Sequence, residues 1–147
     1  MTYSNPVPVA VLLLPVDDGV LCVRRGGRTP SGTPEAGFGH LALPGGFIDV
    51  GETWQEAAAR ELREEANVYV EASAIADLCV RSTENGLVLV FGRGPALTSA
   101  DLPPFSPSDE VTDRAIVRAP VALAFALHTE VVAQYFASRQ LPRRDSH

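Results

Sequence analysis

The chain has 147 residues, of which 46% are hydrophobic and 20% are charged, and its formal net charge is -6. This length suits one domain, and the composition is typical of a globular protein. The acidic balance argues against a broad nucleic-acid surface, because clustered Lys and Arg are needed to bind a phosphate backbone. We therefore expect a single domain over residues 1–147 without a nucleic-acid partner.

The start of the chain carries no signal for secretion or membrane insertion. Met1 to Asn5 has no basic residue, and the apolar run from Val7 to Leu14 is interrupted by Pro8 and too short to span a bilayer. Cys22 and Cys79 lie in apolar runs without close metal-ligand spacing, so both are expected to be reduced core thiols. These features predict a cytoplasmic protein with no membrane partner.

The first third of the chain predicts a hairpin followed by a long loop. Val7 to Val16 is dense in Val and Leu without polar alternation, which predicts a strand covered on both faces. Asp17-Asp18-Gly19 predicts a turn, and Val20 to Arg24 the returning strand. Gly26 to His40 is rich in Gly and Pro and predicts a loop, and Leu41 to Leu43 is a short apolar segment.

A helix is predicted from Thr53 to Ala66. Thr53 and Glu56 have the spacing of a capping box, and Asn67 lies where the chain should leave the helix. The remaining elements are a hairpin of Ile75 to Arg81 with Leu87 to Phe91, a loop from Pro95 to Ser108, a short strand from Ala115 to Val117, and a final helix carrying Val131, Val132, Tyr135 and Phe136. Arg139 to His147 is expected to be a frayed tail, and the fold class is mixed α/β.

The middle helix carries three carboxylates on one arc of its surface. Glu61, Glu64 and Glu65 stand at i, i+3 and i+4, so they fall within about 100° of one another. Like charges at this spacing repel. The arc also adjoins the apolar flank formed by Ala58 and Leu62, so it is not simply a solvated face. Carboxylates placed in this way favour a hard divalent cation with oxygen ligands.

Fixed spacings extend beyond these three residues. From Gly46, five residues lead to Glu52, seven more lead to Arg60, and the rest of the pattern falls on Glu61, Leu62, Glu64, Glu65, Asn67 and Val68. The segment resembles the Nudix box, whose only unmatched position is a final Gly, which is Asn67 here. Asn is the next-best residue for a left-handed helix cap, so we expect activity to be kept.

The resemblance implies an α/β/α sandwich with a mixed central sheet, a catalytic loop-helix-loop and a C-terminal helix. It also implies a Nudix pyrophosphohydrolase that uses Mg²⁺ or Mn²⁺. The implied metal ligands are the Gly45 carbonyl, Glu61, Glu64 and Glu65, with Glu61 alternatively a proton acceptor. Arg60 is expected to fix a carboxylate rotamer, and Glu52 to stabilise the junction between loop and helix.

Members of the family often add an acidic residue from a downstream loop. Glu84, Asp101, Asp109 and Glu110 are the candidates, and Glu110 is preferred because it shortly precedes the last strand. Arg24 and Arg25 are candidate substrate-binding residues; since they alternate in a strand, one should face the site and hold phosphate. Gly46 is the third candidate for substrate binding. His128 is expected to pack or cap the last helix.

The predicted reaction is hydrolysis of the diphosphate bond in a nucleoside diphosphate linked to another moiety. ADP-ribose, dinucleotide polyphosphates, nucleotide sugars and (d)NTPs remain open, whereas NADH is disfavoured because a Ser-Gln-Pro-Trp-type element is missing after the box. One alternative is a Nudix-fold binding or sensor module without catalysis. Another is a diphosphate isomerase on the same fold. A homodimer is allowed by the exposed edge of the second hairpin.

Overall fold

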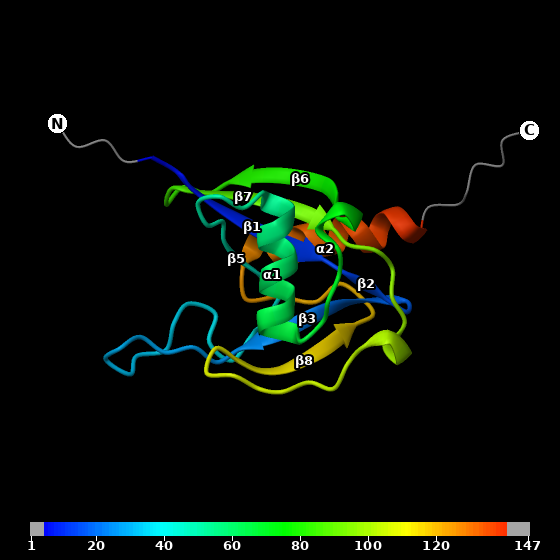
Figure 1. Cartoon of the computed structure of the whole chain (residues 1–147), viewed down its shortest axis with the longest axis horizontal. Helices are drawn as coiled ribbons and strands as arrows, with labels where there is room; N and C mark the ends of the chain where they lie inside the picture. Colours follow the sequence, from blue (N-terminus) through cyan, green and yellow to red (C-terminus); the bar gives the residue numbers. More distant parts are fainter. Residues whose placement is uncertain (1–4, 141–147) are drawn as a thin grey trace, which may run out of the picture.

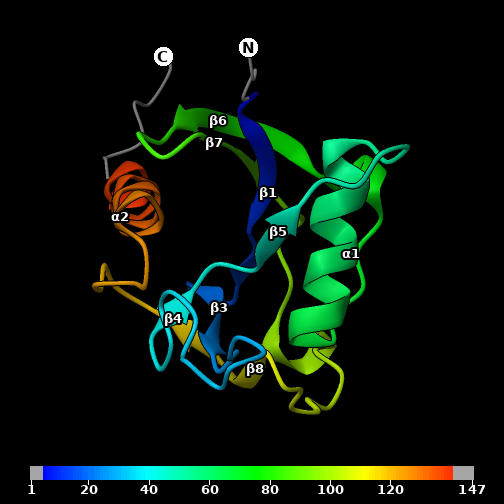
Figure 2. The ribbon, with the colours of Figure 1, turned by 90° about the vertical axis from the view of Figure 1, so that its left-hand side faces the viewer.

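The structure is a computed structural model that describes residues 5–140. Two four-stranded sheets lie between two helices, with α1 (Trp54–Ala66) on one side and α2 (Ala126–Gln140) on the other (Figures 1 and 2). The predicted α/β/α sandwich with a C-terminal helix is confirmed.

The first sheet has the order β5-β1-β7-β6 and is mixed. Its strands are β1 (Val7–Leu13), β5 (Gly45–Phe47), β6 (Ala76–Ser82) and β7 (Leu87–Arg93). β1 and β7 run parallel, with Val9 opposite Leu89, whereas β1 pairs antiparallel with β5 and β6 pairs antiparallel with β7. The parallel pair brings together two segments that are far apart in the sequence.

The second sheet is antiparallel and centres on β3 (Gly19–Arg25). β3 pairs with β2 (Pro15–Val16), β4 (Leu41–Ala42) and β8 (Val111–Val117). Two single-turn 3₁₀ helices, η1 (Ala72–Ala74) and η2 (Ser99–Asp101), lie in the connections.

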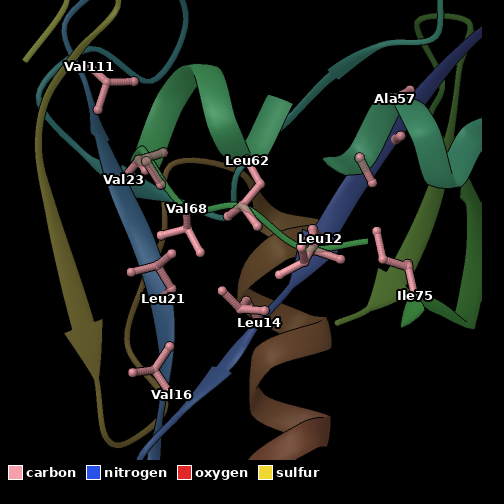
Figure 3. Packing of buried hydrophobic residues seen from close by; sticks show 14 residues of the cluster. Leu12, Leu14, Val16, Leu21, Val23, Ala57, Leu62, Val68, Ile75 and Val111 are labelled. Carbon is pink, nitrogen blue, oxygen red and sulfur yellow. The ribbon is translucent and has the colours of Figure 1, made fainter. Parts of the chain in front are cut away.

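Alternate residues of β1 face opposite halves of the core. Leu12 packs with the apolar face of α1, including Leu62, and Leu21 of β3 joins the same cluster (Figure 3). Val11 and Leu13 belong to the second cluster, which includes Val132 of α2. Full burial of a Leu contributes roughly 1.5–3 kcal/mol, so both faces of β1 stabilise the fold. The prediction of a strand covered on both faces is confirmed for Ala10 to Leu13, whereas Val7 and Pro8 are exposed and the predicted run to Val16 is divided into β1 and β2.

The ends of α1 follow the predicted signals. The Thr53 hydroxyl accepts a hydrogen bond from the Glu56 N–H at 3.1 Å, and the Glu56 carboxylate accepts one from the Thr53 N–H at 2.8 Å. Asn67 adopts the left-handed conformation, with φ of 58°, and donates its N–H to the Arg63 carbonyl. The capping box and the Asn67 cap are therefore confirmed.

Three sequence predictions need correction. β5 was not predicted, because its two glycines lack strand propensity and it forms only by pairing with β1. β8 begins at Val111 instead of Ala115, since pairing with β3 supports its polar first residues. The predicted tail begins too early: Arg139 belongs to α2 and donates a hydrogen bond to the Tyr135 hydroxyl at 2.7 Å. Residues 141–147 of that predicted tail lie outside the described residues.

Neither helix within residues 5–140 combines the length and the apolar run that crossing a bilayer requires. Both cysteines are free thiols. Cys22 is buried, which raises the pKa of its thiol to about 12, whereas Cys79 is only partly buried, so the prediction of a core thiol holds fully for Cys22 alone.

Candidate active site

A cleft of about 1100 Å³ opens where the acidic face of α1, strand β5, the loop after β3 and the start of α2 meet. One end is polar and is formed by Arg25, Glu35, Gly46, Glu61, Glu65 and Glu110. Away from this end the cleft has an apolar floor of Val9, Leu87 and Leu89 from the neighbouring strands β1 and β7, and a polar rim of Ser82 to Asn85, whereas Val11 of β1 lies opposite Gly45.

The polar end is built on the contact between α1 and β5. Glu65 is 8% exposed, and its Oε1 accepts a hydrogen bond from the Gly45 N–H at 2.8 Å. Gly46 lies directly against the Glu61 carboxylate, so that a Cβ on Gly46 would collide with it. A side chain at position 46 would have to displace that carboxylate, so glycine allows Glu61 to lie directly beside β5.

Burial sets the charge state of the two cleft carboxylates. Desolvation raises the pKa of Glu65 to about 8, against the hydrogen bond from Gly45, and the negative charge of Glu61 raises it further. Desolvation also raises the pKa of Glu61, although Arg60 opposes this. The cost of holding both carboxylates ionised favours a cation beside them.

Arg60 joins the acidic residues of the box on the side away from the cleft. Its Nη2 donates to Glu52 at 2.7 Å and to the Phe47 carbonyl at 3.0 Å, and its Nη1 donates to Glu61 at 2.8 Å and to Glu64 at 3.3 Å. Hydrogen bonds from Arg60 lower the pKa of Glu52. The guanidinium thus connects the loop before α1 to the helix itself.

Glu61 and Glu65 each have one carboxylate oxygen held by the chain and one oxygen open. In residues 5–140 no hydrogen bond reaches Oε2 of Glu61 or Oε2 of Glu65, and no buried side-chain oxygen lacks a partner, so these two atoms are accessible. Glu64 differs, because its side chain is 53% exposed and does not line the cleft.

Of the four downstream acidic candidates, Glu84 and Glu110 line the cleft, and Asp101 and Asp109 do not. Glu84 lies on the distant rim. The negative charge of Glu110 helps to raise the pKa values of both Glu61 and Glu65, so Glu110 is the candidate near the acidic face of α1. Its backbone is fixed because its carbonyl accepts the Gly26 N–H at 2.8 Å and its N–H donates to Ser108.

The two adjacent arginines of β3 point to different places. Arg25 lines the cleft, donates from Nε to the Ala36 carbonyl at 2.9 Å, and stacks over the Phe125 ring at 5.0 Å. Arg24 does not line the cleft; it pairs with Asp113 at 3.0 Å. The structure therefore brings only Arg25 together with the cleft carboxylates.

A family model supplies the decisive comparison, because the NUDIX domain model matches residues 5–120. The chain belongs to the NUDIX domain family. The Nudix box carboxylates Glu61 and Glu65 are thus found in a Nudix domain and at the polar end of its main cleft. The prediction of a Nudix hydrolase is confirmed.

Solved structures share the Nudix fold. A Nudix hydrolase from Nitrosomonas europaea is 24% identical with a TM-score of 0.74, and the match covers 94% of this chain and 74% of that one. A MutT Nudix hydrolase from Burkholderia pseudomallei is 22% identical with a TM-score of 0.67, covering 89% and 98%. A bifunctional NMN adenylyltransferase/ADP-ribose pyrophosphatase from Francisella tularensis, solved with AMP and a manganese ion, is 24% identical with a TM-score of 0.60, covering 80% and only 35%.

The Nudix cleft contains residues that the sequence did not single out. Glu35, Phe125 and the first turn of α2 line it, together with Phe47, whose ring is 61% exposed. For Glu35 no sequence signal exists, because it lies in an aperiodic loop. His128 did carry a signal, since it stands three and four residues before Val131 and Val132 on the buried stripe of α2.

The donor set of this Nudix site consists of separate carboxylates. In the part of the chain that the structure describes, no three acidic, His or Cys side chains converge in a ready-made metal cage. Two accessible carboxylate oxygens, of Glu61 and Glu65, beside the Gly45–Gly46 backbone fit a hard divalent cation, which takes oxygen ligands and keeps several waters.

Proposed function

We propose that this Nudix protein is a metal-dependent hydrolase of nucleoside diphosphates that are linked to a second moiety, with Mg²⁺ or Mn²⁺ as the cation. The observation that carries the proposal is the pair of carboxylates of Glu61, which is partly buried, and Glu65, which is buried, each with one oxygen anchored by the chain and each lining the same cleft.

Charge in the cleft explains why a cation is needed. Five carboxylates line it, those of Glu35, Glu61, Glu65, Glu84 and Glu110. Arg25 is the one Lys or Arg among the described residues that line it. A diphosphate would therefore be repelled unless positive charge were added beside the acidic face. Glu61 and Glu65 would hold that cation, with the Gly45 carbonyl and the more exposed Glu64 as further ligands.

A divalent cation held by Glu61 and Glu65 would supply positive charge to the diphosphate oxygens and would make the attacking water easier to deprotonate. The residues of the chain do the rest. Water adds to one phosphorus, the bridging P–O bond breaks, and the bridging oxygen leaves with the second phosphate. Glu110 or Glu61 takes the proton of the water. Arg25 holds a phosphoryl oxygen with its guanidinium.

The remaining box residues have supporting roles in this proposal. Arg60 fixes the rotamer of Glu61 through its 2.8 Å hydrogen bond, while its bonds to Glu52 hold the loop before α1 against the helix. Gly46 leaves room for substrate and carboxylate at the same point.

The size of the cleft supports a substrate of two parts. Its volume of about 1100 Å³ is slightly larger than the usual range for small-molecule sites. The polar end would take the diphosphate. The apolar floor of Val9 and Leu89 beside the exposed Phe47 ring is suited to a flat nucleobase, which can stack on an aromatic side chain.

A substrate panel tests the proposal. ADP-ribose, a nucleotide sugar, a dinucleotide polyphosphate and a dNTP are each incubated with and without Mg²⁺, and phosphate is measured after a coupled phosphatase step. We expect Mg²⁺-dependent release from at least one diphosphate-linked nucleoside. Tight binding of the panel without any turnover would instead support a sensor module.

A further inference from the structure

His128 occupies the first turn of α2 and lines the cleft. His128 is 6% exposed, and its ring has two aromatic neighbours. The Phe125 ring centroid is 5.0 Å away and the Phe91 centroid is 5.9 Å away, both in edge-to-face geometry. This packing fixes the orientation of the imidazole.

One nitrogen of His128 is already used by the backbone. Nδ1 accepts a hydrogen bond from the Leu43 N–H at 3.2 Å, so the proton of the neutral ring must be on Nε2. Burial lowers the pKa of His128 to about 4, and the nearby charge of Arg25 lowers it further, so the ring is neutral near pH 7. Nε2 is therefore a hydrogen-bond donor and not a metal ligand.

The donor on Nε2 has no acceptor in the described part of the chain. No hydrogen bond from this atom is found in residues 5–140, and no buried side-chain nitrogen there lacks a partner. Nε2 must therefore be at the accessible part of a ring that is otherwise enclosed. Because His128 lines the cleft, this N–H is available to a ligand in it.

Arg25 lies near His128 and provides further hydrogen-bond donors on the same side of the cleft. Its charge acts on the pKa values of both His128 and Glu65, so the guanidinium lies within electrostatic range of both. Its Nε is used by the Ala36 carbonyl, whereas both Nη atoms lack a hydrogen-bond partner in residues 5–140. A ligand that accepts hydrogen bonds from both His128 and Arg25 must offer several acceptor oxygens and negative charge, as a phosphoryl group does.

We propose that His128 is a substrate-binding residue whose Nε2–H donates a hydrogen bond to a phosphoryl oxygen beside Arg25. This inference rests on the proposed diphosphate substrate, because it concerns the same cleft. His128 would thus be a neutral hydrogen-bond donor from the C-terminal helix, in addition to the site residues of the box and Arg25 of β3.

Two substitutions separate this role from a purely structural one. The amide of His128→Asn can accept the Leu43 N–H at the place of Nδ1 but has no donor at the place of Nε2. The amide of His128→Gln has the opposite properties. Binding of methylenediphosphonate with Mg²⁺ is measured by calorimetry, with His40→Asn as the control.

We expect His128→Asn to weaken methylenediphosphonate binding about tenfold, as loss of a hydrogen bond to a charged group would. His128→Gln should bind within about threefold of the wild type, and on a hydrolysed substrate KM should rise for His128→Asn with kcat little changed. Full affinity in His128→Asn with a loss in His128→Gln would overturn the proposal, because that pattern reports only the Leu43 contact.

Nitrogen-15 spectra of the wild-type histidines give a test that needs no variant to fold. They should show the Nε2–H tautomer at His128 and a shift of that proton when methylenediphosphonate is added. An Nδ1–H tautomer, or no shift at saturation, would overturn the inference. Binding of methylenediphosphonate with a shift at His128 but no turnover of any panel substrate would refute the proposed function alone, whereas turnover of a panel substrate with no shift of the His128 proton at saturation would refute only the role of His128.

Discussion

The Glu65 carboxylate and the Gly45 N–H are joined by a 2.8 Å hydrogen bond between α1 and β5. This bond anchors one oxygen of a side chain that is 8% exposed, and the second oxygen remains open to the cleft. Glu65 thus connects the box helix to the strand at the start of the Nudix box, and we also propose Glu65 as a metal ligand.

Replacement of the box carboxylates should remove activity and leave the fold intact. In Glu65→Gln the amide oxygen can still accept the Gly45 N–H, but the negative charge is lost. We expect Glu64→Gln and Glu65→Gln each to lose most turnover in Mg²⁺, with Glu130→Gln on the exposed surface of α2 as the control. Turnover within tenfold of the wild type in both variants would refute the assignment of the ligands.

Divalent metal should raise the melting temperature. The cation binds the folded acidic cluster and not the unfolded chain, so its binding energy adds to the free energy of unfolding. A thermal melt with and without millimolar Mg²⁺ or Mn²⁺ measures this, and the increase should be smaller in Glu65→Gln. An unchanged melting temperature in the wild type would count against a functional site.

Glu110 should be needed for the chemical step. Its negative charge helps to raise the pKa values of Glu61 and Glu65, although Glu110 lies in a loop outside the box. If it accepts the proton of water, Glu110→Gln should lower kcat by roughly 10²–10⁴-fold without loss of stability. Glu84→Gln, on the distant rim of the cleft, is the matched comparison. A fall in kcat of less than about threefold would return the role of the base to Glu61.

The stability of the protein should depend on pH through His128. Its pKa is about 4 in the fold and 6.5 for an ordinary His, so between these values the unfolded chain binds more protons. The contribution of neutral His128 to the free energy of unfolding is fully present above pH 6.5 and is lost as the pH falls toward 4. Relative to His128→Asn, the wild type should lose on the order of 2 kcal/mol of unfolding free energy between pH 7 and pH 4.5.

This comparison must be made between the two proteins at each pH by urea denaturation. Glu65 has a raised pKa, so its effect on the free energy of unfolding has the opposite pH dependence. Its stabilising contribution falls as the pH rises from about 4.5 to 8. The difference between wild type and variant cancels that effect. An identical pH dependence in both proteins would show that His128 is not a buried neutral residue.

Local sequence signals predicted the helix of the box well. The capping residues Thr53 and Glu56 and the left-handed Asn67 act within a few residues of one another, so their spacing is sufficient. The carboxylate arc was also visible, because helix geometry fixes which residues share a face. The structure adds that Glu61 and Glu65 line the cleft and that Glu64 does not.

Tertiary contacts decided what the sequence left open. Arg24 and Arg25 alternate in one strand, and only the pairing of Arg24 with Asp113 of β8 tells which of them faces the cleft. Strand β5 depends on β1 and on the space at Gly46. His128 lies on the buried stripe of α2, but its hydrogen bond to Leu43 spans 85 residues of sequence.

Hydrolysis in ¹⁸O-labelled water shows whether water attacks phosphorus in a metal-dependent reaction. The wild type is incubated with Mg²⁺ and ADP-ribose, or with the diphosphate-linked nucleoside of the panel that is hydrolysed fastest. The masses of the products are then measured by mass spectrometry. We expect one labelled oxygen in the phosphate group of one product, and no labelled product without metal or in Glu65→Gln. Products without label in either phosphate, or equal turnover without a divalent cation, would contradict metal-dependent attack of water on phosphorus.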